Sequence, residues 1–210
     1  MFHEAIGHRL EGGRLVARGE TRTFAGKVGE RVLPAGLDVY DDPSGGEGAD
    51  CLPWGGYRVD DEGVAAQRAT LIEHGVLRGF LRNRTPVEAG DGSSGHGRHD
   101  GRQQTMARMS NLVVRAREAT HADEAALESA LVERARSQGR KEAAIIRRIR
   151  AGETSTNSYD FQVFKGELAE VWVIDVATGE RRRVRDVELI GTPLAAMQRI
   201  VGFGGEDEVD

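Results

Sequence analysis

The chain opens on two histidines that flank a glutamate, in the segment His3-Glu4-Ala5-Ile6-Gly7-His8. Neutral imidazole nitrogens are good zinc ligands, and a catalytic zinc takes three protein ligands and leaves a fourth position for water. The metal lowers the pKa of that water to near neutrality. A glutamate beside the first ligand is placed to accept the water's proton and pass it to a leaving amine. The segment therefore predicts a metal site with His3 and His8 as ligands and Glu4 as the general base.

The spacing of the two histidines constrains the backbone that carries them. Residues five apart lie about 140° around a regular α-helix, because each residue turns the helix by about 100°. In the common H-E-x-x-H pattern the histidines are four apart and share one helix face. Both rings here can reach one metal only if the helix is locally widened, as in a single-turn π-bulge, and Gly7 tolerates such a distortion. The alternative is a pair of solvated histidines on a frayed helix end.

Further motifs follow the histidine cluster in a defined order along the chain. The motifs are Arg9-Leu10-Glu11-Gly12-Gly13, residues 24–32, 39–43, 59–63, Gly95-His96-Gly97-Arg98, residues 107–111 and Leu189-Ile190-Gly191-Thr192-Pro193. This ordered series resembles the metal-binding C-terminal domain of the TldD/PmbA family of metallopeptidases. The resemblance implies zinc as cofactor, hydrolysis of peptide bonds, and a paired assembly in which only the TldD-type subunit carries the H-E-x-x-x-H cluster.

The chain departs from the family pattern at both ends. Family members carry a separate N-terminal domain, whereas Met1 here is two residues ahead of His3. They also take a third ligand, a cysteine, from a glycine-rich segment near the C-terminus, and residues 204–210 contain none. We therefore expect one metallopeptidase domain over residues 1–210, shortened at both ends, with an incomplete ligand set. The third ligand could come from Cys51, the one cysteine, or from an Asp or Glu of the cleft.

Composition excludes several classes of function. The formal net charge of -5 argues against general nucleic-acid binding, and the arginine runs 147–150 and 181–185 are interpreted as solvated strand faces. No segment approaches the ~18 apolar residues of a membrane span, and the first residues are too polar for a signal peptide. A single cysteine cannot form an internal disulfide. These observations favour a cytoplasmic chain without membrane or nucleic-acid partners.

Hydrophobic periodicity predicts an α+β fold, a mostly antiparallel curled sheet with two or three helices and the metal-ligand helix at the N-terminus. Residues 141–150 suit a helix by spacing, but their β-branched content and the family resemblance favour a strand. His74-Gly75 forms the turn of a hairpin over 69–81. The other expected strands are 36–41, 57–60, 111–116 and 159–164, with a hairpin that pairs 170–175 with 181–189. The expected helices are the opening one up to Leu10, 123–138 and 193–201, and residues 11–27 are expected as a loop.

The segment Glu88–Gln104 is rich in glycine and holds His96, Arg98 and His99. It is either a flexible loop or a substrate-facing flap near the metal, in which Arg98 or Arg108 grips a peptide carboxylate or carbonyl.

Two functions remain open from sequence. One is a zinc-dependent peptidase acting on small or unfolded peptides, assembled as a homodimer or with a related subunit. The other is a non-catalytic interaction module that pairs with a full-length metallopeptidase.

Overall fold

The structure, a computed structural model, describes residues 2–16, 23–46, 51–87, 92–101, 104–154 and 163–204. The side chains of Glu4, Ala5, Val16, Thr154 and Pro193 are outside this description. The helices are α1 (Phe2–Ala5), the 3-10 helix η1 (Gly7–Leu10), α2 (Gly13–Val16), α3 (Glu124–Ser137) and α4 (Pro193–Gln198). The strands are β1 (Leu37–Asp41), β2 (Ala69–Glu73), β3 (Val76–Leu77), β4 (Gly97–Arg98), β5 (Met106–Ala107), β6 (Leu112–Ala116), β7 (Glu142–Thr154), β8 (Phe164–Asp175), β9 (Arg181–Val184) and β10 (Glu188–Gly191).

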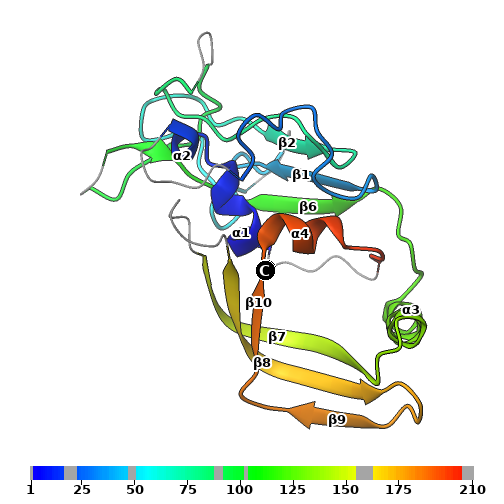
Figure 1. The fold of residues 1–210 in the computed structure, drawn as a ribbon. Coiled ribbons are helices and arrows are strands. Elements are labelled where there is room, and N and C mark those ends of the chain that lie inside the picture. Colours follow the sequence, from blue (N-terminus) through cyan, green and yellow to red (C-terminus); the bar gives the residue numbers. More distant parts are fainter. Residues whose placement is uncertain are drawn as a thin grey trace.

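The strands confirm the α+β class and pair antiparallel, but they are divided between separate sheets (Figure 1). One four-stranded sheet has the order β3-β2-β1-β6, and a second has the order β10-β8-β7 with β9 also paired to β8. The strands β4 and β5 form a short ribbon of their own. Among the described helices, none combines the length and the apolar content that crossing a membrane requires.

The first sheet is built from the segments that the sequence predicted most directly. β1 and β6 are in register from Leu37 opposite Ala116 to Asp41 opposite Leu112. The hairpin of β2 and β3 turns at His74 and Gly75, whose φ angles are 51° and 74°. Positive φ at both central residues is typical of the type I′ turn, so the expected hairpin is confirmed.

The main hydrophobic core lies where this sheet meets the opening segment and α4. Leu10 of η1, Val39 of β1, Ile72 of β2 and Met197 of α4 are each 1% exposed or less. Figure 1 shows α1 and α4 next to each other beside β6. The core therefore anchors the opening helical turns that carry the two histidines.

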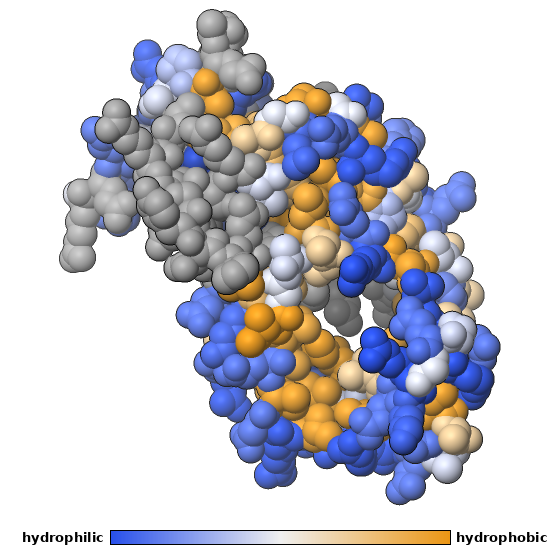
Figure 2. All heavy atoms as spheres, in the orientation of Figure 1, coloured by the Kyte–Doolittle hydropathy of each residue, from blue (hydrophilic) through white to orange (hydrophobic). Residues whose placement is uncertain are grey.

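The second sheet forms a long arm. β7 and β8 pair from Glu142 opposite Asp175 to Thr154 opposite Phe164, which confirms the predicted strand over 141–150. α3, capped by the Asp123 side chain, packs on β7 through a small cluster around Ala135 and Ala143. Figure 2 shows apolar side chains gathered on the open face of the arm. Residues 142–150 lie in β7, so the helix alternative for 141–150 was wrong.

Three expectations are corrected by the fold. Residues 57–60 are not a strand, because the Asp60 carboxylate accepts the backbone N–H groups of Glu62, Val64 and Gly97 and turns the chain. The expected loop 11–27 contains α2. The single strand expected over 181–189 is broken at Asp186, whose φ is 55°: β9 pairs with residues 171–174 of β8, and β10 pairs with residues 164–167 of the same strand.

Two further expectations are met only in part. The predicted strand 159–164 falls mostly on residues 159–162, which lie outside the described residues, and β8 begins at Phe164. The last helix starts at Pro193 as expected but ends at Gln198, before the expected end at Val201.

Candidate metal centre

The structure brings His3 and His8 together where α1 meets η1. Their Nε2 atoms are 3.1 Å apart, and the ring planes are nearly perpendicular at 88°. Two nitrogen ligands of a tetrahedral zinc, each 2.0–2.1 Å from the metal, are separated by about 3.3 Å. The separation of the two Nε2 atoms is that of a hydrogen bond between the rings, and it is also close to the separation of two ligands on one metal.

The backbone reaches this arrangement without the π-bulge that the spacing suggested. α1 ends at Ala5, Ile6 adopts φ -129° and ψ -28°, and the chain resumes as the tighter 3-10 turn η1. His8 is turned toward His3 by a break between two short helices, in place of the widened helical turn that the spacing suggested. The expectation of a bulge was wrong because the segment is two single turns, each with its own helical twist.

Gly7 packs closely against the end of the Met109 side chain. A Cβ atom at this position would lie 2.2 Å from Met109 Sδ and 3.3 Å from Leu112 Cδ2. The 3-10 turn therefore rests directly on the segment that precedes β6. This contact ties the position of His8 to residues about a hundred positions further along the chain.

Glu11, which sequence reasoning gave no role, holds the ring of His8. His8 Nδ1 lies 3.1 Å from Glu11 Oε1, and the Glu11 side chain is only 1% exposed. A carboxylate accepts hydrogen bonds, so this contact favours the His8 tautomer with its hydrogen on Nδ1. In that tautomer the lone pair on Nε2 is available to a metal. Carboxylates placed behind ligating histidines in this way are usual in zinc sites.

Two arginines also contact the Glu11 carboxylate. Arg14 Nε donates to Oε2 at 2.7 Å, and Arg108 Nη1 lies 3.4 Å from the same oxygen. Burial by itself would raise the pKa of the Glu11 carboxyl, but the hydrogen bonds from His8 and Arg14 outweigh it and lower the pKa. Glu11 thus stays ionised behind His8. The signal in the sequence was its position three residues after a histidine, where side chains share a helix face.

The remaining predicted ligand and base residues are placed only in part. Glu4 follows His3 on α1, and its side chain is outside the described part of the structure. Among the described residues, no group of three or more His, Cys, Asp or Glu is arranged to hold a metal. Within that part of the chain, Cys51 is exposed and does not join His3 and His8. His3 and His8 are therefore the two predicted ligands that the described structure brings together.

Arg98 and Arg108 line one cavity of about 230 Å³, together with His99, Asp100, Gln104 and Met106. Arg98 pairs with Asp61 at 3.2 Å, and its guanidinium carbon lies 4.5 Å from the centre of the Tyr57 ring. The β4–β5 pairing sets Arg98 opposite Met106, so the described part of the expected loop 88–104 is partly an ordered ribbon.

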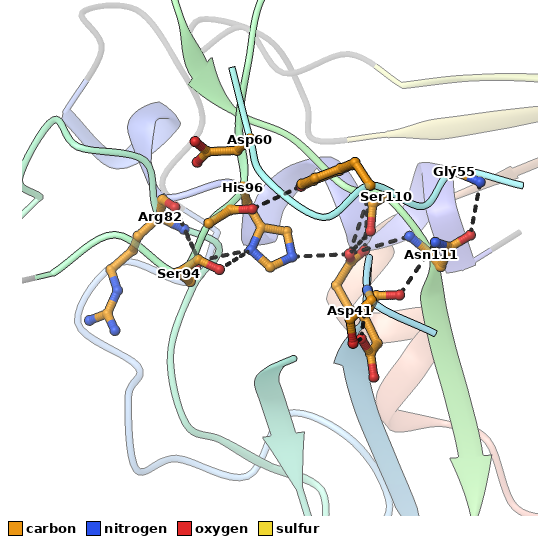
Figure 3. A network of polar contacts seen from close by, with 12 residues as sticks. Asp41, Gly55, Asp60, Arg82, Ser94, His96, Ser110 and Asn111 are labelled. Atoms are coloured by element: carbon orange, nitrogen blue, oxygen red, sulfur yellow. Dashed lines mark hydrogen bonds and ion pairs between the residues drawn. The ribbon is translucent and has the colours of Figure 1, made fainter. Parts of the chain in front are cut away.

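A buried polar network supports the segment that carries Arg108 and Met109 (Figure 3). Asp41, at the end of β1, is 0% exposed and accepts hydrogen bonds from the backbone N–H and hydroxyl of Ser110. It also lies 3.1 Å from His96 Nε2, and His96 is likewise 0% exposed. The backbone N–H of Arg108 donates to the His96 carbonyl. The network therefore fixes residues 108–110 beneath Gly7 and beside Glu11.

Comparison with known proteins places the chain in a family. A sequence model of the PmbA/TldA metallopeptidase C-terminal domain matches residues 1–209. The chain belongs to this family of metallopeptidases.

Individual relatives agree with the family match. A metalloprotease of Methanothermobacter thermautotrophicus is 30% identical over 98% of this chain and 40% of its own length. A TldD homologue from Haemophilus influenzae is 34% identical over 53% of this chain and 22% of its own length. The crystal structure of TldE from Thermococcus kodakarensis has the same fold, with a TM-score of 0.66 and 22% identity over 98% of this chain and 42% of that one. The chain spans less than half the length of each of these relatives.

Proposed function

We propose that this chain is the metal-binding part of a zinc-dependent peptidase that hydrolyses peptide bonds of small or unfolded peptides. The observation that carries the proposal is the 3.1 Å separation of the His3 and His8 Nε2 atoms, with Glu11 behind His8. Imidazole pairs backed by a buried carboxylate suit zinc better than they suit the hard cations, which prefer oxygen ligands.

In this proposal each residue has a separate task. When bound, zinc supplies an activated water and polarises the peptide carbonyl. His3 and His8 hold the metal, and Glu4 accepts the water's proton and delivers it to the leaving amine. Glu11 keeps His8 in the ligating tautomer. Arg98 and Arg108 hold the substrate.

The proposal is tested by zinc titration of the metal-free chain with a chromophoric chelator as competitor. We expect one zinc per chain, binding at least about tenfold weaker in His8→Ala, and unchanged zinc but no peptide cleavage in Glu4→Gln. His74→Asn is the matched control, since it removes an exposed imidazole at a position where Asn tolerates positive φ. Equal zinc affinity of the wild type and His8→Ala would refute the assignment.

A second function, a non-catalytic interaction module, is favoured by a different observation. The described residues supply only two clustered ligands, and structural zinc sites use four and catalytic sites three. In this case the chain binds no zinc by itself, and wild type and Glu4→Gln behave alike in every assay. The titration above separates the two functions.

We further propose that the chain acts as a homodimer or pairs with a related subunit, in the cytoplasm. The likeness to both a TldD homologue and a TldE structure supports a paired assembly. The single cysteine supports a reducing compartment. Sedimentation of the chain with and without a TldE-type relative measures the assembly, and a chain that stays monomeric in both would contradict it.

A further inference from the structure

The cavity between Arg98 and Arg108, here called the arginine pocket, is joined to the histidine pair by a short series of contacts. Arg108 Nη1 lies 3.4 Å from Glu11 Oε2, and Glu11 Oε1 lies 3.1 Å from His8 Nδ1. Only one carboxylate and one imidazole ring stand between the guanidinium and His8 Nε2. The Arg108 guanidinium is therefore within about 11 Å of His8 Nε2, or about three residues of extended peptide.

Arg108 has hydrogen-bonding capacity to spare. A guanidinium carries five N–H donors in a planar fork, and Arg108 uses Nη1 for Glu11. Within the described residues, the structure assigns no partner to its other donors. The side chain is 38% exposed, in contrast to Glu11 at 1%, so one side of Arg108 faces the buried carboxylate and the other faces the pocket.

The pocket has the size and the hydrogen-bond donors for one small anionic group. Its lining includes two guanidinium groups, which Asp61 and Glu11 contact from outside the lining, and one carboxylate, Asp100. Arg98 is held in place by Asp61 and by the Tyr57 ring. The volume of about 230 Å³ is below the range of drug-sized ligand sites and suits about one amino-acid residue. Met106 supplies an apolar wall.

We propose that the arginine pocket binds a carboxylate of the peptide substrate, and that it thereby selects peptide bonds within about three residues of that carboxylate. This inference rests on the proposed peptidase function and names its substrate class. A forked pair of N–H···O bonds from arginine matches a carboxylate and adds orientation to charge. The carboxylate comes from the C-terminus of the peptide or from an acidic side chain.

Binding measurements without metal test the pocket separately from catalysis. The probe is an N-terminally fluorescein-labelled alanine tripeptide in three forms: free C-terminal acid, C-terminal amide, and an amide whose last residue is glutamate. Fluorescence anisotropy with the metal-free 210-residue chain gives the affinity for each. We expect the free acid to bind at least about tenfold tighter than the alanine amide. Tight binding of the glutamate amide would extend the site to acidic side chains, and weak binding would restrict it to C-termini.

Substitutions then assign the preference to the pocket. Arg108→Gln is expected to remove the difference in affinity between acid and amide, and Arg108→Lys to retain part of that difference. Arg98→Gln provides a second variant that leaves the Glu11 contact intact. Arg117→Gln, which removes a similarly exposed arginine directly after β6, is the control and should keep the full preference. Equal binding of acid and amide to the wild type overturns the proposal, whatever the zinc titration shows.

Discussion

The Met109 sulfur occupies the space into which a side chain at residue 7 would project, because a Cβ on Gly7 would lie 2.2 Å from Sδ. Met109 is followed by Ser110, which donates two hydrogen bonds to the buried Asp41. The turn that carries His8 therefore rests on a segment held from the end of β1. Local backbone geometry at the histidines depends on a contact between distant parts of the chain.

Gly7→Ala tests this contact. We expect a loss of about 1–3 kcal/mol in the free energy of unfolding, because the added methyl overpacks the site, together with weaker zinc binding. Urea denaturation measures the first effect and chelator competition the second. Met109→Ala in the same chain makes room and should restore part of both. Gly13→Ala is the matched control, since a Cβ there meets nothing within 4 Å; a loss of equal size in Gly13→Ala would contradict the explanation.

Glu11→Gln tests the support behind His8. The amide can still contact Nδ1, but it has no charge to offset Arg14 and Arg108, so we expect about 10–100-fold weaker zinc binding. Zinc titration at neutral pH measures the effect. Glu30→Gln removes an exposed carboxylate that pairs with Lys27 and should change nothing. Unaltered zinc affinity in Glu11→Gln would mean that Glu11 does not act on His8.

Asp41→Asn tests the buried network. Asn keeps the shape, but its amide nitrogen cannot accept the hydrogen bonds that the carboxylate takes from Ser110, so we expect unfolding to become easier by about 1–3 kcal/mol, as for a buried polar group left unpaired. Hydrogen exchange should show the backbone amide of Ser110 less protected than in the wild type. A double-mutant cycle with His96→Gln should give a coupling energy of about 1–3 kcal/mol. Additive effects of the two substitutions would show that the side chains act independently.

Much of the fold was predictable because its signals are local. The turn residues His74 and Gly75 and the helix cap Asp123 each shape the backbone within a few residues of their own position. Alternation then places the strands that flank the turns. Residues 57–60 were wrongly predicted as a strand. The Asp60 side chain accepts hydrogen bonds from nearby backbone N–H groups, and an alternating pattern of apolar residues does not reveal this competition with strand pairing.

Of the candidate site, sequence reasoning found only the two histidines that the structure brings together. His3 and His8 are visible because they stand close together in sequence. The contact of Asp41 with His96 joins positions 55 apart, and that of Glu11 with Arg108 joins positions 97 apart. No period or spacing rule connects such pairs, since they are set by the packing of segments that are far apart in the sequence. The residues that support a site are for this reason harder to find than its ligands.

A last prediction concerns Tyr57, whose ring packs against Arg98 at the edge of the arginine pocket, and the stability of the chain at alkaline pH. Burial raises the pKa of Tyr57 to about 12, with the negative charge of Asp41 adding to the effect and Arg98 opposing it. In the unfolded chain the pKa of a tyrosine is about 10. Between about pH 10 and about pH 12 the unfolded chain loses this proton while the folded chain keeps it, so the contribution of Tyr57 to stability falls as the pH rises.

Tyr57→Phe isolates this effect. The variant loses the hydrogen bond to the Gly95 carbonyl at every pH, so it should be less stable than the wild type at neutral pH. Its stability should then decline less steeply above pH 10, because no phenol remains to ionise on unfolding. Denaturation at a series of pH values gives both curves, and absorbance near 295 nm follows the phenolate directly. If the two curves run parallel from pH 9 to pH 12, the Tyr57 hydroxyl is not protected in the folded chain.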